Sequence, residues 1–286
     1  MDGIVIIDKP QNWTSQDVTA KLRSVFRTRR IGHGGTLDPM ATGVLPVFVG
    51  RATRGVEFFE HAEKIYETVL QLGITTDTED ITGTVLTQQP VSVTEEQLLA
   101  VLAQFKGEIQ QIPPMYSAIK INGQKLCDLA RKGKEVERAP RTITIHSLDL
   151  LGMEENRVRL RVHCSKGTYI RTLCKDIGEA LGCGGCMAEL RRVAAGSYSI
   201  TEAIPLAQIV ADPQPEQYLR NVDSMFTQYE AVTLTEKQAL RTRNGNSFSI
   251  DLPDGTYRAY DKNGEFLMLA KVEGGIMSTI KSFFNV

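Results

Sequence analysis

Long hydrophobic runs are missing from this 286-residue chain. The longest, around residues 3–7 and 43–50, are too short to cross a bilayer, and no positively charged, then apolar leader precedes them. The sequence also has no internal repeat and no low-complexity tract. With 42% hydrophobic residues it can still bury a substantial core, so we expect a soluble, cytoplasmic protein with one large and one small domain.

Cysteine is scarce and badly arranged for disulfides. The five cysteines, an odd number, all lie within residues 127–186, so we expect reduced thiols. Cys183 and Cys186 have zinc-knuckle spacing, but no second such pair exists, and the βαβ context of a thioredoxin motif is absent. Residues 32–35 match neither a phosphate loop nor a dinucleotide fingerprint. We therefore expect no metal and no cofactor.

The net charge of −1 hides a segregation of charge along the sequence. Residues 116–142 hold seven Lys or Arg against three acids, and residues 157–192 hold eight against three. Acids collect instead in residues 57–80, where Lys64 is the only Lys or Arg. Such asymmetry can build a basic face that binds phosphates, although solvated surfaces without any partner would give the same counts.

The first two thirds of the chain read as alternating strands and helices. Strands are expected at 3–8, 44–49 and 66–73, an antiparallel pair at 142–150 and 158–162, and helices after Thr14 or Ser15, at 94–107 and at 168–181. Gly182 to Gly185 should form a flexible break before a further helix that carries Leu190. The polar, basic residues 115–140, which include Asn122-Gly123, are expected to form a projecting loop or a short helical insertion.

The sequence pattern changes from alternating strands and helices to mainly short strands after a connection that runs through residues 204–231. Thr235 and Gln238 form a capping box, and Gly245 stands at C-cap distance. Strand-like runs at 248–252, 257–260, 266–272 and 276–284 are then separated by turn residues, among them the hairpin signal Asn263-Gly264. This pattern predicts a small, barrel-like β module of about 55 residues.

The most informative segment is the run from Gly32 to Pro46, GHGGTLDPMATGVLP. Its glycines allow a close backbone approach, and Pro39 restricts Asp38 to extended conformations. A carboxylate held in this way suits a preorganised reaction. The same residues could equally open a turn or cap a helix, which are common roles of Asp.

Three further polar groups could act with Asp38. Tyr66 begins a strand and could present its phenol, although a strand tyrosine is more often a packing residue. Residues 164–171 form a basic turn into a helix, and Arg171 in it could pair bidentately with Asp38. Residues 116–120 lie at the base of the expected loop.

Taken together, these residues resemble the bacterial TruB-type tRNA pseudouridine synthases. The match runs in order over nearly all of residues 3–197. Its segments are GIVIIDKP, GHGGTLDPMATGVLP, KIYETVLQLG, YSAIKINGQKLCDLARKG, CSKGTYIRTLCKDIGEALG and LRRVAAG. The terminal β module is similar to the PUA domain of those enzymes.

The resemblance implies an α+β pseudouridine synthase fold with a mixed, mainly antiparallel sheet flanked by helices, and a small C-terminal PUA-like β-barrel. It places a catalytic domain at residues 1–229, with an RNA-gripping insertion at about 115–140, and an RNA-binding domain at 230–286. The implied activity is a cofactor-free isomerisation of uridine 55 in the TΨC loop of tRNA to pseudouridine, by a monomer that needs no protein partner and no membrane. The nucleotide must be flipped out to reach the enzyme's carboxylate.

The resemblance also implies roles for single residues. Asp38 would be the catalytic carboxylate, by attack on C1′ or by a glycal route, with Arg171 holding it and Tyr66 stacking on the uracil. The implied substrate-binding residues are His33, Tyr169, Leu190, Lys9 and Lys120. Small departures are Gly34 where many relatives have Thr, Cys127-Asp128 where Tyr-Glu is common, and Cys183 to Cys186 where Gly-Ala-His is frequent.

Two other functions remain open from the sequence. One is a tRNA-folding chaperone, alone or together with the isomerase activity. The other is a guide-RNA-dependent synthase, because archaeal and eukaryotic relatives share the same core and terminal module.

Overall fold

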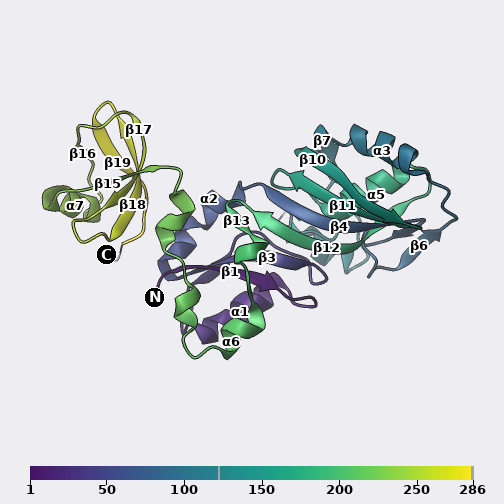
Figure 1. The fold of residues 1–286 in the computed structure, drawn as a ribbon, viewed down its shortest axis with the longest axis horizontal. Helices are drawn as coiled ribbons and strands as arrows, with labels where there is room; N and C mark the ends of the chain where they lie inside the picture. The colour runs from purple at the N-terminus through teal and green to yellow at the C-terminus, as the bar shows by residue number, and fades with distance from the viewer. Residues whose placement is uncertain (122, 285–286) are drawn as a thin grey trace. The chain divides into compact units, whose positions relative to one another are not determined.

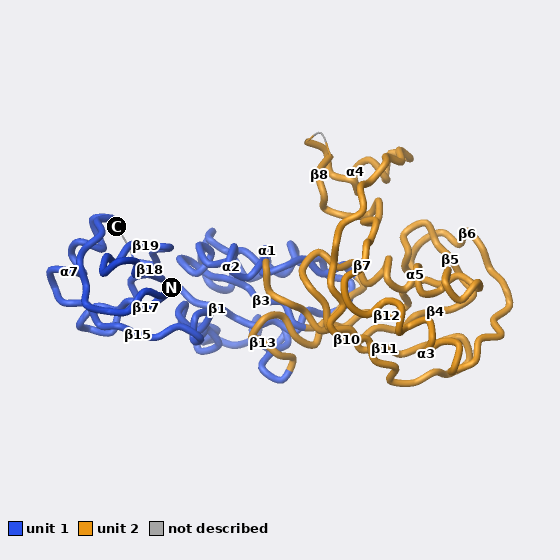
Figure 2. Tube along the Cα trace, turned by 90° about the horizontal axis from the view of Figure 1, so that it is seen from above, with its two compact units in different colours: residues 1–39, 44–60, 201–286 blue, residues 40–43, 61–200 orange. Residues whose placement is uncertain are grey.

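The structure is a computed structural model that describes residues 1–121 and 123–284. It divides into two compact units (Figure 2). Unit 1 contains residues 1–39, 44–60 and 201–286, and unit 2 contains residues 40–43 and 61–200. Asn122, part of the turn expected in the basic insertion, lies outside the described residues.

Unit 1 begins with a strand, a helix and a short β-ladder (Figure 1). These elements are β1 (Gly3–Lys9), α1 (Ser15–Val25), β2 (Ile31–His33) and β3 (Thr42–Val49), followed by η1 (Gly50–Gly55) and α2 (Val56–Glu60). The expected N-cap of α1 is confirmed, because the Thr14 hydroxyl accepts the N–H of Asp17 while the Asp17 carboxylate accepts that of Thr14. β2 pairs antiparallel with β3.

The connection that returns to unit 1 after residue 200 is made of short pieces. They are η2 (Ile200–Glu202), β14 (Ile204–Pro205), α6 (Leu206–Ala211), η3 (Pro215–Tyr218) and η4 (Val222–Phe226). β14 extends the sheet of unit 1 by pairing parallel with β1. Pro205 ends this pairing after two residues, since proline has no N–H to donate to a ladder.

The expected C-terminal β module is confirmed. It contains β15 (Glu230–Thr233), α7 (Glu236–Arg243), β16 (Phe248–Ser249), β17 (Gly255–Tyr260), β18 (Phe266–Glu273) and β19 (Ile276–Ser282). The strands follow the order β15-β17-β18-β19-β16 and form a half-barrel, as expected for a PUA-like domain. Its core includes Leu267, Ala270, Val272 and Met277, none of which is exposed. β15 was expected to belong to the connection, and the capping box at Thr235 is confirmed.

Unit 2 is built on a mixed, mainly antiparallel sheet, as expected. Its antiparallel strands are ordered β12 (Gly185–Ala195), β4 (Lys64–Leu72), β11 (Arg157–Cys164), β10 (Arg141–Glu154) and β7 (Gly107–Gln111), with the short β13 (Tyr198–Ser199) paired to β12. Thr42 and Gly43, the first residues of β3, pair parallel with Arg191 and Arg192 of β12. Gly43 is required there, because a Cβ would lie 2.2 Å from the Arg192 carbonyl oxygen.

Helices cover the sheet of unit 2. α5 (Ile170–Ala180) packs against β12 and β4, and α3 (Glu95–Gln104) contacts β10 and α5. At 11 residues each, α1 and α5 are the longest helices in the described part of the chain. Within residues 1–121 and 123–284 no helix combines the length and apolarity that crossing a membrane requires.

Two hairpins extend from this sheet. The first is β5 (Ile74–Thr76) with β6 (Val85–Gln88), and the second is β8 (Lys120–Ile121) with β9 (Gln124–Lys125), followed by α4 (Leu126–Ala130). Figure 2 shows β8 and α4 projecting from the rest of unit 2, which confirms the expected insertion. Leu126 and Leu129 anchor it, being 0% and 9% exposed.

The prediction of a helix around Leu190 is wrong, because residues 185–195 form strand β12. β12 pairs along most of its length with β4 and is largely buried. Register shifts after Met187 and after Arg192 interrupt the two-residue alternation by which a strand is recognised in sequence. Burial between neighbouring strands therefore overrides the local preference of its Ala, Glu and Leu residues for helix.

Candidate active site

In unit 1, Asp38 lies in an irregular segment whose backbone is fixed on both sides. On the N-terminal side, Leu37 is buried, and its N–H donates to the Ser15 hydroxyl at 2.9 Å, while that hydroxyl lies 3.3 Å from the Leu37 carbonyl. Ser15 is the first residue of α1 and is 1% exposed. The start of the helix therefore fixes the peptide groups that precede Asp38.

On the C-terminal side, the Pro39 carbonyl is the fixed group. It accepts the backbone N–H of Asn12 at 2.8 Å and lies 3.3 Å from the Lys9 ammonium. Lys9 is fully buried and also donates to the carbonyls of Pro10 and Trp13, at 2.9 and 2.5 Å. A buried ammonium needs such partners, and here they tie the end of β1 to the residue after Asp38.

The half-buried Asp38 carboxylate thus leaves a backbone that neighbouring elements hold in place. Gly34 and Gly35 permit the turn that brings it there. A Cβ at Gly34 would lie 2.5 Å from the Phe59 ring, and Gly35 has a φ of 87°. His33, the last residue of β2, is half-buried, with its Nε2 atom 3.3 Å from the side-chain nitrogen of Gln16.

In unit 2, Tyr66 and Leu190 lie on adjacent central strands. Tyr66 of β4 pairs with Val162 of β11 and with Arg192 of β12, and it is 8% exposed. Leu190 of β12 stands opposite Thr68, whose hydroxyl donates to the Glu189 carbonyl at 2.7 Å. The sheet therefore fixes the backbone of both residues.

Arg171 connects three segments of unit 2. It lies in the first turn of α5 and is 5% exposed. One terminal nitrogen donates to the Thr78 carbonyl at 3.2 Å, and the other donates to the Tyr116 carbonyl at 2.8 Å. A guanidinium has five N–H donors in a fixed fork, so these two bonds determine its orientation and leave further donors for other acceptors.

Tyr169 is held by a side chain that the sequence did not single out. The Gln111 amide oxygen accepts the Tyr169 N–H at 2.8 Å, and the amide nitrogen donates to the Tyr169 carbonyl at 3.1 Å. Gln111 is 2% exposed at the end of β7. Both polar ends of this buried amide are thus used to fix the peptide of Tyr169, which is the N-cap of α5.

The insertion carries exposed, uncompensated positive charge. Within the described part of the chain, four of its bases have no acid within ion-pairing distance, and neither has Arg141 just after it: Lys120, Lys125, Lys132 and Lys134. Arg131 and Arg138 pair instead with Asp128 and Glu135, at 3.6 and 3.1 Å. This segment therefore keeps a net positive field that phosphates would feel.

Two ion pairs join the other two charged stretches. Arg161 pairs with Glu67 at 3.0 Å, and Lys175 pairs with Glu79 at 3.5 Å. Arg157 pairs at 2.5 Å with Glu189 inside the basic stretch itself. Strand pairing of β11 with β4 places Arg161 directly opposite Glu67, so the segregation seen along the sequence is partly neutralised there.

The cysteines are free, as expected. Burial raises the pKa of Cys164 and of Cys186 to about 11 and that of Cys174 to about 12. Burial also raises the pKa of Cys183. Because the thiolate is the reactive form, these residues are poor nucleophiles at neutral pH.

The residues expected to form the site thus fall into two preorganised groups. Asp38, Lys9 and His33 belong to unit 1, and the others, listed next, belong to unit 2. They are Tyr66, Lys120, Tyr169, Arg171 and Leu190. The pairing of Asp38 with Arg171 stays a prediction.

Comparisons with known proteins place these residues in a family. The model of the TruB family pseudouridylate synthase N-terminal domain matches residues 23–170, and that of the tRNA pseudouridylate synthase B C-terminal domain matches residues 171–227. A relative from Stutzerimonas stutzeri called tRNA pseudouridine synthase B is 43% identical over 95% of this chain and 92% of its own. A protein of the same name from Clostridium kluyveri is 42% identical over 93% of this chain and 94% of its own length.

Solved structures show the same fold. A chain of a Cbf5-Nop10-Gar1 complex is 26% identical, with a TM-score of 0.74, and the similarity covers 99% of this chain and 85% of that one. A chain of an H/ACA RNP bound to a substrate RNA containing 2'-deoxyuridine has the same TM-score at 24% identity, over 99% and 85%.

Fold and family models together define an isomerase of the pseudouridine synthase class. The chain belongs to the TruB family of pseudouridylate synthases, and the resemblance seen in its sequence is confirmed.

Proposed function

We propose that this chain converts uridine 55 in the TΨC loop of tRNA to pseudouridine, with Asp38 as the catalytic carboxylate. The observation that carries the proposal is the clamped segment around Asp38, in which Ser15, Lys9 and Asn12 hold the peptides on both sides. The curated relatives carry the name tRNA pseudouridine synthase B, which supports tRNA as the substrate.

The reaction detaches uracil from N1, turns it, and rejoins it through C5. A base inside a stacked loop cannot undergo this change, so the nucleotide must first be flipped out. Asp38 would then act on the ribose or base, as a nucleophile at C1′ or by promoting a glycal route. A carboxylate that is held before the substrate arrives lowers the entropic part of the barrier.

The remaining residues would bind and orient the nucleotide. Arg171 would pair with the Asp38 carboxylate, Tyr66 would stack on the uracil, and Tyr169 and Leu190 would line the pocket. Lys9 is fully buried, so its contribution would come through the Pro39 carbonyl that it contacts. His33 would support the flipped-out loop.

The insertion at 115–140 would grip the TΨC arm. Its exposed bases, Lys120 among them, have the charge and the accessibility that phosphate contacts require. Residues 1–229 would form the catalytic domain, and residues 230–286 a PUA-like RNA-binding domain. We infer a cytoplasmic monomer that needs neither a cofactor nor a protein partner.

The experiment uses the purified chain with an unmodified tRNA transcript that carries tritium at C5 of its uridines. We expect release of one equivalent of tritium, and none from a transcript in which uridine 55 is replaced by cytidine. Release that does not depend on position 55 would contradict the assigned substrate.

A guide-RNA-dependent synthase is the alternative that the likeness to the Cbf5-Nop10-Gar1 complex favours. It is separated by the same assay on a bare TΨC stem-loop with no other protein or RNA present. Turnover there supports the stand-alone enzyme, whereas activity only after a guide RNA is added supports the alternative.

A tRNA-folding chaperone activity would coexist with the isomerase, because the basic insertion can bind tRNA without Asp38. An Asp38→Asn variant that still speeds the refolding of misfolded tRNA would support it. A variant that loses both activities would assign no separate folding role.

A further inference from the structure

We propose that Glu63, His146 and His163 form a binding site for a divalent transition-metal ion such as Zn²⁺ or Ni²⁺. All three belong to unit 2, and we call them the Glu63 cluster. His146 lies on β10, His163 on β11, and Glu63 directly precedes β4. Their side chains are 35%, 33% and 54% exposed, so an ion from solvent can reach them.

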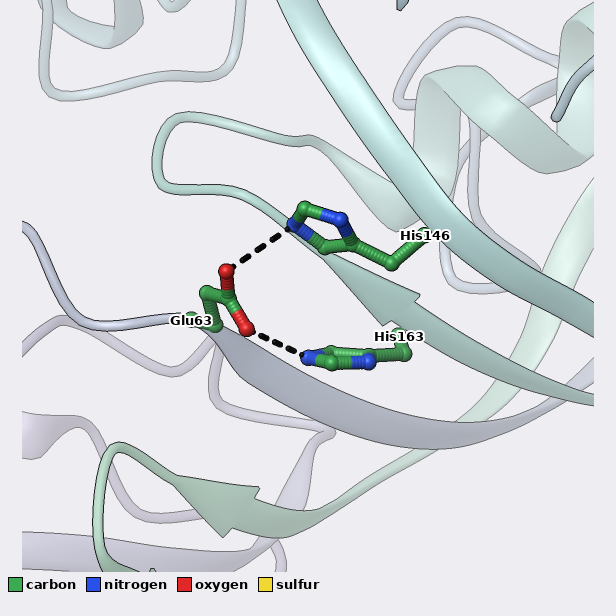
Figure 3. A group of neighbouring side chains, drawn as sticks. All are labelled: Glu63, His146 and His163. Atoms are coloured by element: carbon green, nitrogen blue, oxygen red, sulfur yellow. Dashed lines mark hydrogen bonds and ion pairs between the residues drawn. The ribbon is translucent and has the colours of Figure 1, made fainter. Parts of the chain in front are cut away.

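The potential ligand atoms already converge. The Nε2 atom of His146 lies 3.2 Å from one Glu63 carboxylate oxygen, and the Nε2 atom of His163 lies 2.8 Å from the other. Figure 3 shows both rings directed at the same carboxylate, one at each oxygen. The ring centroids are 4.8 Å apart, and the three ligand atoms lie within 4.8 Å of one another.

These separations suit a small ion after modest side-chain rotation. Zn²⁺ binds nitrogen and carboxylate oxygen at about 2.0–2.2 Å, so ligand atoms around a tetrahedral ion stand about 3.3 Å apart. Imidazole ligands favour Zn²⁺, Ni²⁺ and Cu²⁺ over Mg²⁺ and Ca²⁺, which prefer oxygen. The remaining coordination positions would face solvent and hold water.

A β-bulge lies where the two histidines meet. On β10, Ile145 pairs with Cys164 and Ser147 pairs with His163, so His146 is an extra residue with no partner of its own in the β10–β11 ladder. In an unbroken antiparallel ladder it would stand opposite His163. The bulge instead places His146 and Ser147 together beside His163, and bulges commonly redirect side chains in this way.

The backbone beneath the cluster is fixed. The Glu63 carbonyl accepts the N–H of Gly196 at 2.9 Å, and His163 pairs with Ile65 inside the ladder between β11 and β4. Glu63 is two residues before Ile65, so strand alternation directs it to the same face as His163. Only side-chain rotations are then needed to bind an ion, which limits the entropy lost on binding.

The test measures binding of ZnCl₂ and of NiCl₂ to the full chain by isothermal titration calorimetry. Variants His146→Ala, His163→Ala and Glu63→Gln remove one ligand each. His61→Ala is the matched control, because His61 is another histidine of unit 2 whose Nδ1 atom contacts the Lys166 ammonium at 2.6 Å outside the cluster. Circular dichroism verifies that every variant is folded.

We expect one ion per chain, with affinity about 10- to 100-fold weaker in each ligand variant and unchanged in the control. The thermal unfolding midpoint should rise with metal in the wild type and control only, since an ion that binds the folded state stabilises it. Binding that is equal in all variants would overturn the proposal. So would thiolate charge-transfer absorption when Co²⁺ is added as a spectroscopic probe, because cysteines would then hold the ion.

Discussion

The Ser15 hydroxyl accepts the Leu37 N–H at 2.9 Å, which joins the first residue of α1 to the residue before Asp38. Ser15→Ala leaves that buried N–H unsatisfied, at a cost of about 1–3 kcal/mol in the free energy of unfolding. Because the Asp38 backbone loses one of its restraints, we expect kcat to fall about 10- to 100-fold with little change in KM for tRNA. Steady-state tritium release measures both constants.

Ser24→Ala is the control for this variant. Ser24 lies on the same helix, but it is exposed and its hydroxyl donates only to the Lys21 carbonyl. Its kinetics should match the wild type. A Ser15 variant with unchanged kcat would show that the restraint on Leu37 does not position the carboxylate.

Gln111→Leu removes both hydrogen bonds to the Tyr169 peptide while keeping the volume of the side chain. We expect a fall in kcat/KM of about tenfold or more, because each lost bond to a buried group is worth about 1 kcal/mol or more. The neighbouring Gln110→Leu is the comparison, since that exposed amide bonds only the Thr142 hydroxyl. Equal kinetics for the two variants would contradict a positioning role for Gln111.

Lys132→Gln together with Lys134→Gln should weaken tRNA binding and reduce its dependence on salt. Each phosphate contact adds about 0.7 to 0.9 to the slope of log K against log salt concentration, so we expect a slope smaller by about 1.4 to 1.8. Filter binding at salt concentrations from about 50 to about 300 mM measures this slope. Arg157→Gln with Arg161→Gln, whose charges are paired with Glu189 and Glu67, should change the slope less.

Asp176 should make stability depend on pH. Burial raises the pKa of this carboxyl on α5 from 3.8 to about 6, and nearby Glu179 and Glu79 add to the rise against the effect of Lys175. The folded state therefore holds the proton more tightly than the unfolded state, and stability falls as pH rises from about 3.8 to about 6.

Asp176→Asn removes this penalty. We expect it to stabilise the protein by about 1–2 kcal/mol at pH 7, with the gain vanishing below about pH 4. Urea unfolding at about pH 4.5, 6 and 7.5 tests this, with Glu155→Gln, an exposed acid in the turn between β10 and β11, as control. A gain that is the same at every pH would rule out the titration of Asp176 as its cause.

Local signals in the sequence account for much of the fold. The capping boxes at Thr14, Thr94 and Thr235 each start a helix where expected, because these hydroxyls bond backbone N–H groups close by in sequence. β12 was missed because its two register shifts depend on pairing with β4, which no local pattern encodes. The bulge at His146 depends on pairing in the same way.

Motifs in the sequence single out candidate central residues of the site, but not the residues that support them. Asp38, Tyr66 and Arg171 stand out through motifs, whereas Gln111 bonds Tyr169 across 58 residues of sequence. A lone glutamine at a strand end carries no signal of its own. Likewise, Glu67 on the adjacent strand neutralises the charge of Arg161. A count of charged residues along the sequence cannot detect this pairing.

The most direct measurement compares tritium release and tRNA binding for wild type and Asp38→Asn, with Asp149→Asn, an exposed carboxylate on β10, as control. Asp38→Asn keeps the shape of the side chain and removes its charge. We expect no detectable release by that variant, tRNA affinity close to that of the wild type, and full activity in the control. Multiple turnovers by Asp38→Asn at a rate near that of the wild type would contradict the role assigned to this carboxylate.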